Sequence, residues 1–221
     1  MFNETPIKQR LLITFGKSGA LKYTSNLDIA KIWERVLRRA NLPLLYSQGF
    51  NTRPRIQLAS ALPLGITSEC ELLDVSLKEP IDLTDVQEQL RSVSPAGLDI
   101  YAIEPIDVRY PALQTLVTGT EYRIHFLDDI SHQDLNQRVE ALLARDTIIK
   151  EEIRKGRRNV TDLRPLIHDL TIDDQGDLIA HVSVGSRGNV RPEDVLRELG
   201  LESTPYTVHR QKLELAPPAK L

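Results

Sequence analysis

Cysteine is almost absent from this 221-residue chain, and Cys70 is its single example. No disulfide can form within the chain, so the expected location is a reducing compartment, the cytoplasm. One cysteine also cannot ligate an iron–sulfur cluster or a four-cysteine zinc site. The five histidines are dispersed and lack the spacing of a metal motif. We therefore expect no metal and no cofactor.

Long apolar runs are missing as well. No stretch approaches the ~18 apolar residues that a membrane-spanning helix needs, and Met1–Arg10 lack the apolar core of a secretory signal. The Gly16-Lys17-Ser18 triplet has no glycine at the place that a phosphate loop requires, and no Gly-x-Ser-x-Gly nucleophile motif is present. We expect no membrane contact and no catalytic activity of the chain on its own.

The net charge of −3 hides an asymmetry along the chain. Residues 1–60 contain ten Lys and Arg against three acidic residues, whereas residues 61–109 contain three against ten. An anionic partner responds to local charge, because fields decay over about 8–10 Å in physiological salt. The two segments can also neutralise each other within the fold, and both explanations stay open.

In the first half of the chain, hydrophobic periodicity predicts alternating strands and helices. Ser25 and Asp28 have the spacing of a helix-capping box, and Pro43 ends the helix that they begin. The predicted order is a strand at 10–15, a helix between Ser25 and Pro43, strands at 56–59 and 72–77, a helix from Thr84 and a strand at 98–103.

The second half repeats this order after a proline-containing segment without periodicity. Its predicted elements are a strand at 122–126, a helix from Ser131, strands at 164–172 and 178–184, a helix from Pro192 and a strand at 206–215. We therefore predict an α+β protein of two tandem ferredoxin-like (βαββαβ) units, which cover residues 1–106 and 121–221 and are joined by a linker at 107–120.

Basic residues indicate a binding surface for nucleic acid or for a partner protein. Arginines on the exposed side of the first predicted helix are followed by a loop that combines arginines with two aromatic residues, as single-stranded nucleic acids prefer. A second basic segment at 154–158 leads to the second strand of the second unit, and solvated surfaces are the simpler explanation of both. The candidate residues are Arg35, Arg38, Arg39, Tyr46, Ser47, Gln48, Phe50, Asn51, Arg53, Arg55, Arg154, Arg157 and Arg158.

Several short motifs between Lys17 and Leu77 occur together, among them Ser25-Asn26-Leu27-Asp28, Tyr46-Ser47-Gln48-Gly49-Phe50-Asn51 and Leu62-Pro63-Leu64-Gly65. In this combination the chain resembles a bacterial family, the radical-SAM-linked domain of unknown function. Members of that family are fused to a radical-SAM protein or encoded beside one, so the resemblance implies such a partner. The predicted architecture is also similar to that of tandem ferredoxin-like RNA-processing proteins, a similarity of fold that does not determine function.

The leading hypothesis is a non-catalytic RNA-binding or substrate-presenting partner of a radical-SAM enzyme encoded nearby. One alternative is a module that docks on that enzyme without touching nucleic acid. Another is a metal-independent hydrolase or nuclease that uses Asp28, Ser47 and Asn51.

Overall fold

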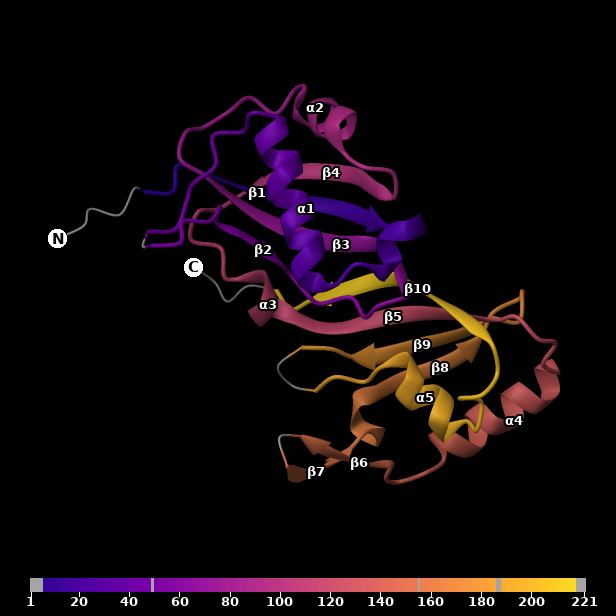
Figure 1. Ribbon diagram of the computed structural model, residues 1–221. Coiled ribbons are helices and arrows are strands. Elements are labelled where there is room, and N and C mark those ends of the chain that lie inside the picture. The colour runs from indigo at the N-terminus through magenta and orange to yellow at the C-terminus, as the bar shows by residue number, and fades with distance from the viewer. Residues whose placement is uncertain (1–5, 49, 155, 186–187, 218–221) are drawn as a thin grey trace. The chain divides into compact units, whose positions relative to one another are not determined.

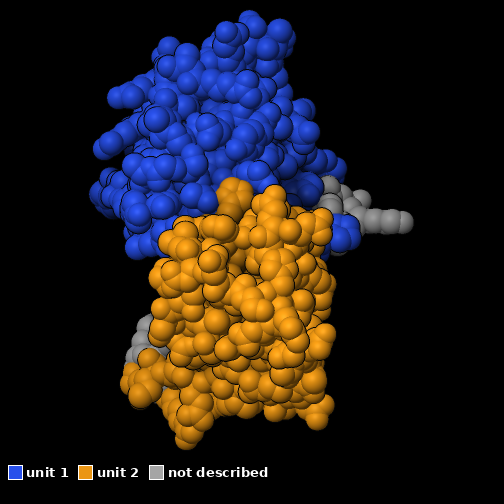
Figure 2. Space-filling model, turned by 90° about the vertical axis from the view of Figure 1, so that its right-hand side faces the viewer, with its two compact units in different colours: residues 1–117, 215–221 blue, residues 118–214 orange. Residues whose placement is uncertain are grey.

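A computed structural model describes residues 6–48, 50–154, 156–185 and 188–217. The chain divides into two compact units (Figure 2). Unit 1 comprises Met1–Val117 with Leu215–Leu221, and unit 2 comprises Thr118–Glu214. Each unit combines β-strands with helices (Figure 1), so the predicted α+β class is confirmed. In the described part of the chain, no helix is long and apolar enough to cross a membrane.

Unit 1 follows the predicted order of strands and helices. Its main elements are β1 (Gln9–Lys17), α1 (Asn26–Arg39), β2 (Ile56–Leu58), β3 (Thr67–Leu77), α2 (Val86–Val93) and β4 (Leu98–Ile106), with a 3-10 turn, η1, at Gly19–Tyr23 and a short helix, α3, at Leu113–Leu116. The strands lie in the order β4-β1-β3, β2 pairs with β3, and every pair is antiparallel. Each long helix therefore connects two strands that are separated by a third.

Helix α1 forms where local sequence signals favour it. The Ser25 hydroxyl oxygen accepts a hydrogen bond from the Asp28 N–H at 3.2 Å, which satisfies one of the free donors of the first turn. The apolar side of the helix buries Trp33, whose ring meets that of Phe15 edge-on at 5.0 Å. Full burial of an apolar side chain contributes about 1.5–3 kcal/mol, so this stripe holds α1 against the sheet.

The opposite face of the unit 1 sheet is closed by the chain that follows β4. Alternation along the strands places Arg10 and Asp74 away from the helices, and the two form a buried ion pair. The Arg10 guanidinium also donates to the carbonyl oxygens of Val108, at 3.1 Å, and Tyr110. Part of the predicted linker thus packs against unit 1.

Unit 2 repeats the arrangement and adds one hairpin. Its main elements are β5 (Val117–Phe126), α4 (His132–Leu143), β8 (Ile167–Ile172), β9 (Leu178–Ser183), α5 (Pro192–Glu198) and β10 (Tyr206–Leu215). The strand order within this unit is β10-β5-β9-β8. Between α4 and β8, strand β6 (Ile149–Arg154) pairs with β7 (Arg157–Asp162).

The structure differs from the predicted elements of this half at three places. Strand β5 begins at Val117, inside the predicted linker 107–120, where Gly119 leaves room for a neighbouring side chain. The basic segment 154–158 was predicted to lead to the second strand of the unit, but it holds the end of β6 and the start of β7, with Gly156 between them at a positive φ of 75°. Arg164–Leu166 form a 3-10 turn, η2, before β8, because Pro165 has no N–H to donate to a ladder.

Candidate functional site

The exposed side of α1 carries four basic residues, Lys31, Arg35, Arg38 and Arg39. Lys31 lies 3.8 Å from Asp28 and Arg38 lies 3.9 Å from Glu34, and both pairs are open to solvent. Such surface pairs contribute about 0–1 kcal/mol, so a ligand can displace them at small cost. Within the described residues, Arg35 and Arg39 have no ion-pair partner.

The loop that follows α1, residues 46–55, is termed here the basic loop. Its base is closed by backbone hydrogen bonds: Arg55 N–H donates to the carbonyl of Leu45 at 2.7 Å, and Ser47 N–H donates to that of Arg53 at 2.8 Å. The Ser47 hydroxyl oxygen also accepts from Arg53 N–H at 3.0 Å. Ser47, a predicted contact residue, therefore shapes the loop.

Most of the described side chains of the basic loop face solvent. The Phe50 ring is fully exposed, at 115% of its reference area, and Gln48, Asn51, Arg53 and Arg55 are exposed as well. Tyr46 is 40% exposed. The Arg38 guanidinium lies 5.7 Å from the centre of the Tyr46 ring, within the range of a cation–π contact. This contact links the basic side of α1 to the basic loop in one surface.

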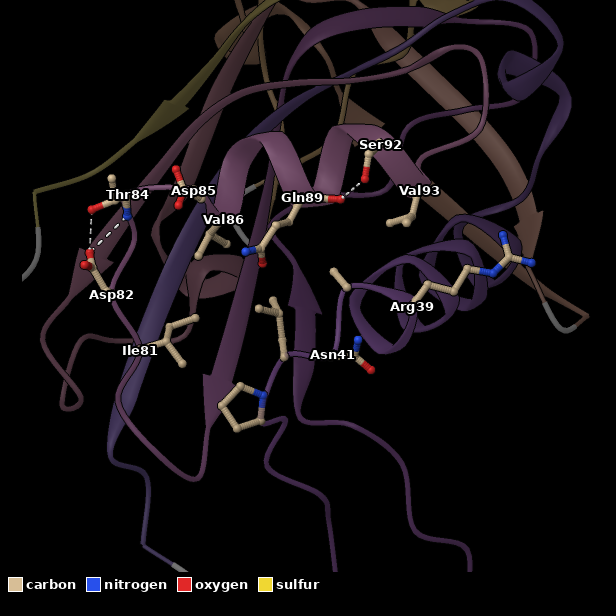
Figure 3. Close-up of a pocket in the computed structure, with 13 residues that line it drawn as sticks. Arg39, Asn41, Ile81, Asp82, Thr84, Asp85, Val86, Gln89, Ser92 and Val93 are labelled. Atoms are coloured by element: carbon tan, nitrogen blue, oxygen red, sulfur yellow. Dashed lines mark hydrogen bonds between the residues drawn. The ribbon is translucent and has the colours of Figure 1, made fainter.

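Two clefts of unit 1 border this surface. Arg55 lines a cleft of about 460 Å³ together with Arg10 and Tyr110. A second cleft, of about 600 Å³, separates the end of α1 from α2. Figure 3 shows Arg39 on one side of this second cleft and Asp82 with Thr84 on the other.

The second cleft has an apolar lining that includes Ile81, Val86 and Val93. A hydrogen bond from the Thr84 hydroxyl, at 2.8 Å, is the main cause of a lowered pKa for the Asp82 carboxyl. Asp82 therefore stays ionised at neutral pH and cannot serve there as a proton donor. The cleft therefore combines an apolar lining with the ionised Asp82 carboxylate.

The charge asymmetry of the sequence is partly neutralised within the fold. Arg10 and Lys17, two of the ten basic residues before position 61, are buried. Arg10 pairs with Asp74 of the acidic segment. The exposed positive charge of unit 1 is therefore smaller than the composition suggests, and it gathers on α1 and the basic loop.

Of the three arginines predicted in the second unit, the structure describes one side chain. Arg158 donates to the Glu151 carboxylate, with Nε at 3.1 Å from Oε2, across the β6–β7 pair. The side chains of Arg154 and Arg157 lie outside the described part of the structure. Glu151 thus offsets the charge of Arg158, which weakens the case for a second anion surface.

The residues of the hydrolase alternative are not brought together as a relay. The Ser25 hydroxyl hydrogen-bonds to the Asp28 carboxylate at 2.6 Å and is the main cause of a lowered Asp28 pKa. Asp28 is therefore an ionised carboxylate in the first turn of α1, hydrogen-bonded to the capping Ser25, while Ser47 closes the basic loop. Among the described residues, no group of three or more His, Cys, Asp or Glu side chains is placed to hold a metal ion.

One cluster was missed at the sequence level. The rings of His168 and His181 meet with their centroids 4.9 Å apart. These residues lie on β8 and β9, and their meeting depends on how the two strands pair. The concentration of all five histidines after residue 117 was the one available signal.

Comparison with known protein families identifies the family of this chain. Residues 10–192 match the sequence model of a family described as "Uncharacterized protein conserved in bacteria (DUF2344)". No curated protein matches the sequence.

Among solved structures, the chain is similar to one in "Crystal Structure of a Cbf5-Nop10-Gar1 Complex", with a TM-score of 0.46 and 11% identity over 92% of this chain and 48% of that one. It is also similar to a chain in "Structure of H/ACA RNP bound to a substrate RNA containing 2'-deoxyuridine", with a TM-score of 0.42 and 10% identity over 91% of this chain and 47% of that one. The chain therefore spans about half the length of these solved chains.

Proposed function

The chain belongs to this family of uncharacterized bacterial proteins, and we propose that it binds single-stranded RNA and presents it to a radical-SAM enzyme. The observation that carries the proposal is the Arg38–Tyr46 contact, which joins the exposed arginines of α1 to the basic loop. The element and strand orders of both units support two tandem ferredoxin-like units as the scaffold of this surface.

Each component of the surface has a distinct role in this proposal. Arg35, Arg38, Arg39, Arg53 and Arg55 contact phosphates, because a guanidinium donates two parallel hydrogen bonds to a phosphate. Phe50 stacks on a base, an interaction that contributes about 1–3 kcal/mol per base. The partner enzyme follows from the resemblance of residues 17–77 to the radical-SAM-linked family.

The exposed Phe50 also favours a second candidate, a module that docks on the enzyme without RNA. A fully exposed ring fits an apolar pocket of a protein as well as it fits a base. The two candidates differ in their dependence on salt, because phosphate contacts release counterions and apolar contacts do not.

The test is titration of the purified chain with a fluorescently labelled single-stranded oligoribonucleotide between about 50 and 200 mM salt. If four or five arginines engage phosphates, the log–log slope of affinity against salt should be about −3. The Arg53→Ala/Arg55→Ala double variant should flatten the slope by about 1.4 units. Arg109→Ala is the matched control, since Arg109 is exposed and pairs with Asp107 outside this surface.

Phe50→Ala separates stacking from charge. This variant should lower RNA affinity by about 1–3 kcal/mol and leave the salt slope unchanged. Its thermal midpoint should match that of the wild type, because the ring has no burial to lose. If a folded wild-type protein shows no RNA binding at about 50 mM salt, the docking candidate replaces the proposal.

A further inference from the structure

The sheet of unit 2 has one apolar face and one polar face. Leu178, Ala180 and Val182 of β9 are fully buried and lie on the apolar face. His181 and Ser183 alternate with them and therefore lie on the other face. The set of His168, His181, Ser183 and Glu214 is called here the histidine face.

Two features of the backbone bring these four side chains together. The pairing of β8 with β9 shifts register between Ile167 and Asp169, so His168 lies at a β-bulge, which re-aims side chains. Gly119 of β5 lies between β9 and β10, and a Cβ at this position would lie 2.8 Å from the Glu214 carboxylate. Because Gly119 has no side chain, Glu214 reaches across β5 to His181.

Each imidazole is held by one nitrogen. His168 Nε2 lies 2.9 Å from the Ser183 hydroxyl, and His181 Nε2 lies 3.0 Å from the Glu214 carboxylate. Within the described residues, the Nδ1 atoms of both rings have no hydrogen-bond partner. The two rings therefore form a pre-oriented pair with an interplanar angle of 54°, in which His168 is exposed and His181 is 33% exposed at its side chain.

Acidic groups outnumber basic ones around this pair of rings. Glu214 also pairs with Lys212 at 2.9 Å, and this hydrogen bond is the main cause of its lowered pKa. Glu121 and Asp169 lie opposite His181 on the neighbouring strands. A surface built for phosphates carries surplus positive charge, which the histidine face lacks.

A face without surplus positive charge, with aromatic rings and ring nitrogens that make no hydrogen bond, matches a nucleobase and not a phosphate. Bases stack on aromatic side chains, histidine included, and expose donors and acceptors along their edges. Contacts with phosphates position a nucleic acid, and contacts with bases select its sequence. Unit 1 carries groups suited to contacts with phosphates, and unit 2 carries groups suited to contacts with bases.

We propose that the histidine face of unit 2 binds nucleobases of single-stranded RNA, with a base stacked on His168 and its edge hydrogen-bonded to ring nitrogens of the pair. This site rests on the RNA binding proposed for unit 1 and assigns sequence selection to unit 2.

The experiment compares variants of the full chain in the same RNA titration. His168→Ala should weaken binding by about 5- to 140-fold, the equivalent of 1–3 kcal/mol per stacked base. The salt slope should not change, because no phosphate contact is lost. His168→Phe keeps a ring of similar size and should retain most of the affinity. His132→Ala is the matched control, since His132 begins α4 and is not part of the histidine face.

Selectivity provides a second measurement. Among homopolymeric oligoribonucleotides, the wild type should prefer one base, and the His168→Ala/His181→Ala double variant should lose that preference. If this double variant binds every homopolymer as the wild type does, while Arg53→Ala/Arg55→Ala weakens binding, the histidine face is not a base site and the function of unit 1 stands. If the folded wild type binds no RNA, both proposals fail.

Discussion

The two units share a strand order and differ in what their sheets carry on the face away from the helices. In unit 1 this face holds the buried Arg10–Asp74 pair and is covered by residues 108–110. In unit 2 it holds the exposed His168 beside His181. The same scaffold therefore uses one polar face for internal structure and leaves the other accessible.

The comparison shows why a repeated fold does not imply a repeated function. Unit 1 contains none of the five histidines, and a group of its exposed basic residues lies on α1 and the basic loop. Unit 2 contains all five, and its Glu214 carboxylate lies within ion-pair distance of both His181 and Lys212. Side chains placed on a common frame decide which ligand each unit can take.

The largest expected loss of stability comes from removing one partner of the buried Arg10–Asp74 pair in unit 1. Arg10→Ala leaves the Asp74 carboxylate buried without its partner, which should lower the free energy of unfolding by about 3–5 kcal/mol. Urea unfolding followed by fluorescence of Trp33, the single tryptophan, measures the change. The matched variant in unit 2 is Arg123→Ala, which removes a half-exposed pair with Asp173 and should cost less than about 1 kcal/mol. Equal losses of unfolding free energy in the two variants would contradict the view that the polar face is buried in unit 1 and accessible in unit 2.

A smaller difference in stability is expected between variants of the residues that precede two equivalent helices, α1 and α4. Ser25 caps α1 through a side-chain hydrogen bond, so Ser25→Ala should lower the free energy of unfolding by about 1 kcal/mol. Ser131 occupies the same position before α4 and makes no such hydrogen bond. Ser131→Ala should therefore have almost no effect in the same assay. A greater loss at Ser131 than at Ser25 would show that capping does not distinguish the units.

The smallest expected effect is a pH dependence from Glu214. The hydrogen bond from Lys212, and to a lesser extent that from His181, holds the pKa of Glu214 below its usual value of 4.5. The ionised carboxylate therefore contributes stability above about pH 4.5, and this contribution is lost as the pH falls through the lowered pKa. Glu214→Gln should be less stable than the wild type at pH 7 by under about 1 kcal/mol. That gap should close as the pH falls through the lowered pKa of Glu214, and a gap independent of pH would assign it to packing.

Structural features that depend on nearby residues were predicted well from the sequence. The Ser25–Asp28 cap and the apolar stripe of α1 depend on residues three or four positions apart, so they are visible without the fold. The exposed arginines of α1 follow from the same periodicity. The role of Ser47 was not predictable, because its hydroxyl finds Arg53 N–H only when the basic loop closes.

The boundaries that failed depend on distant neighbours. Val117–Thr120 form part of β5 through pairing with strands more than 50 residues away. Arg154, Arg157 and Arg158 belong to a hairpin because residues 149–154 pair with residues 157–162. The hydrophobic pattern of these segments does not reveal either pairing, because the prolines and glycines nearby indicate turns instead.

By itself, the sequence determined the α+β class, the capped and amphipathic α1, and the concentration of arginines around the loop that follows it. These features arise from spacing along the chain, which a one-dimensional pattern records. Tertiary structure alone decided that Arg10 is buried against Asp74 and that His168 meets His181. Each of these contacts joins separate strands, and the register of the sheet, which no single segment encodes, sets which side chains face one another.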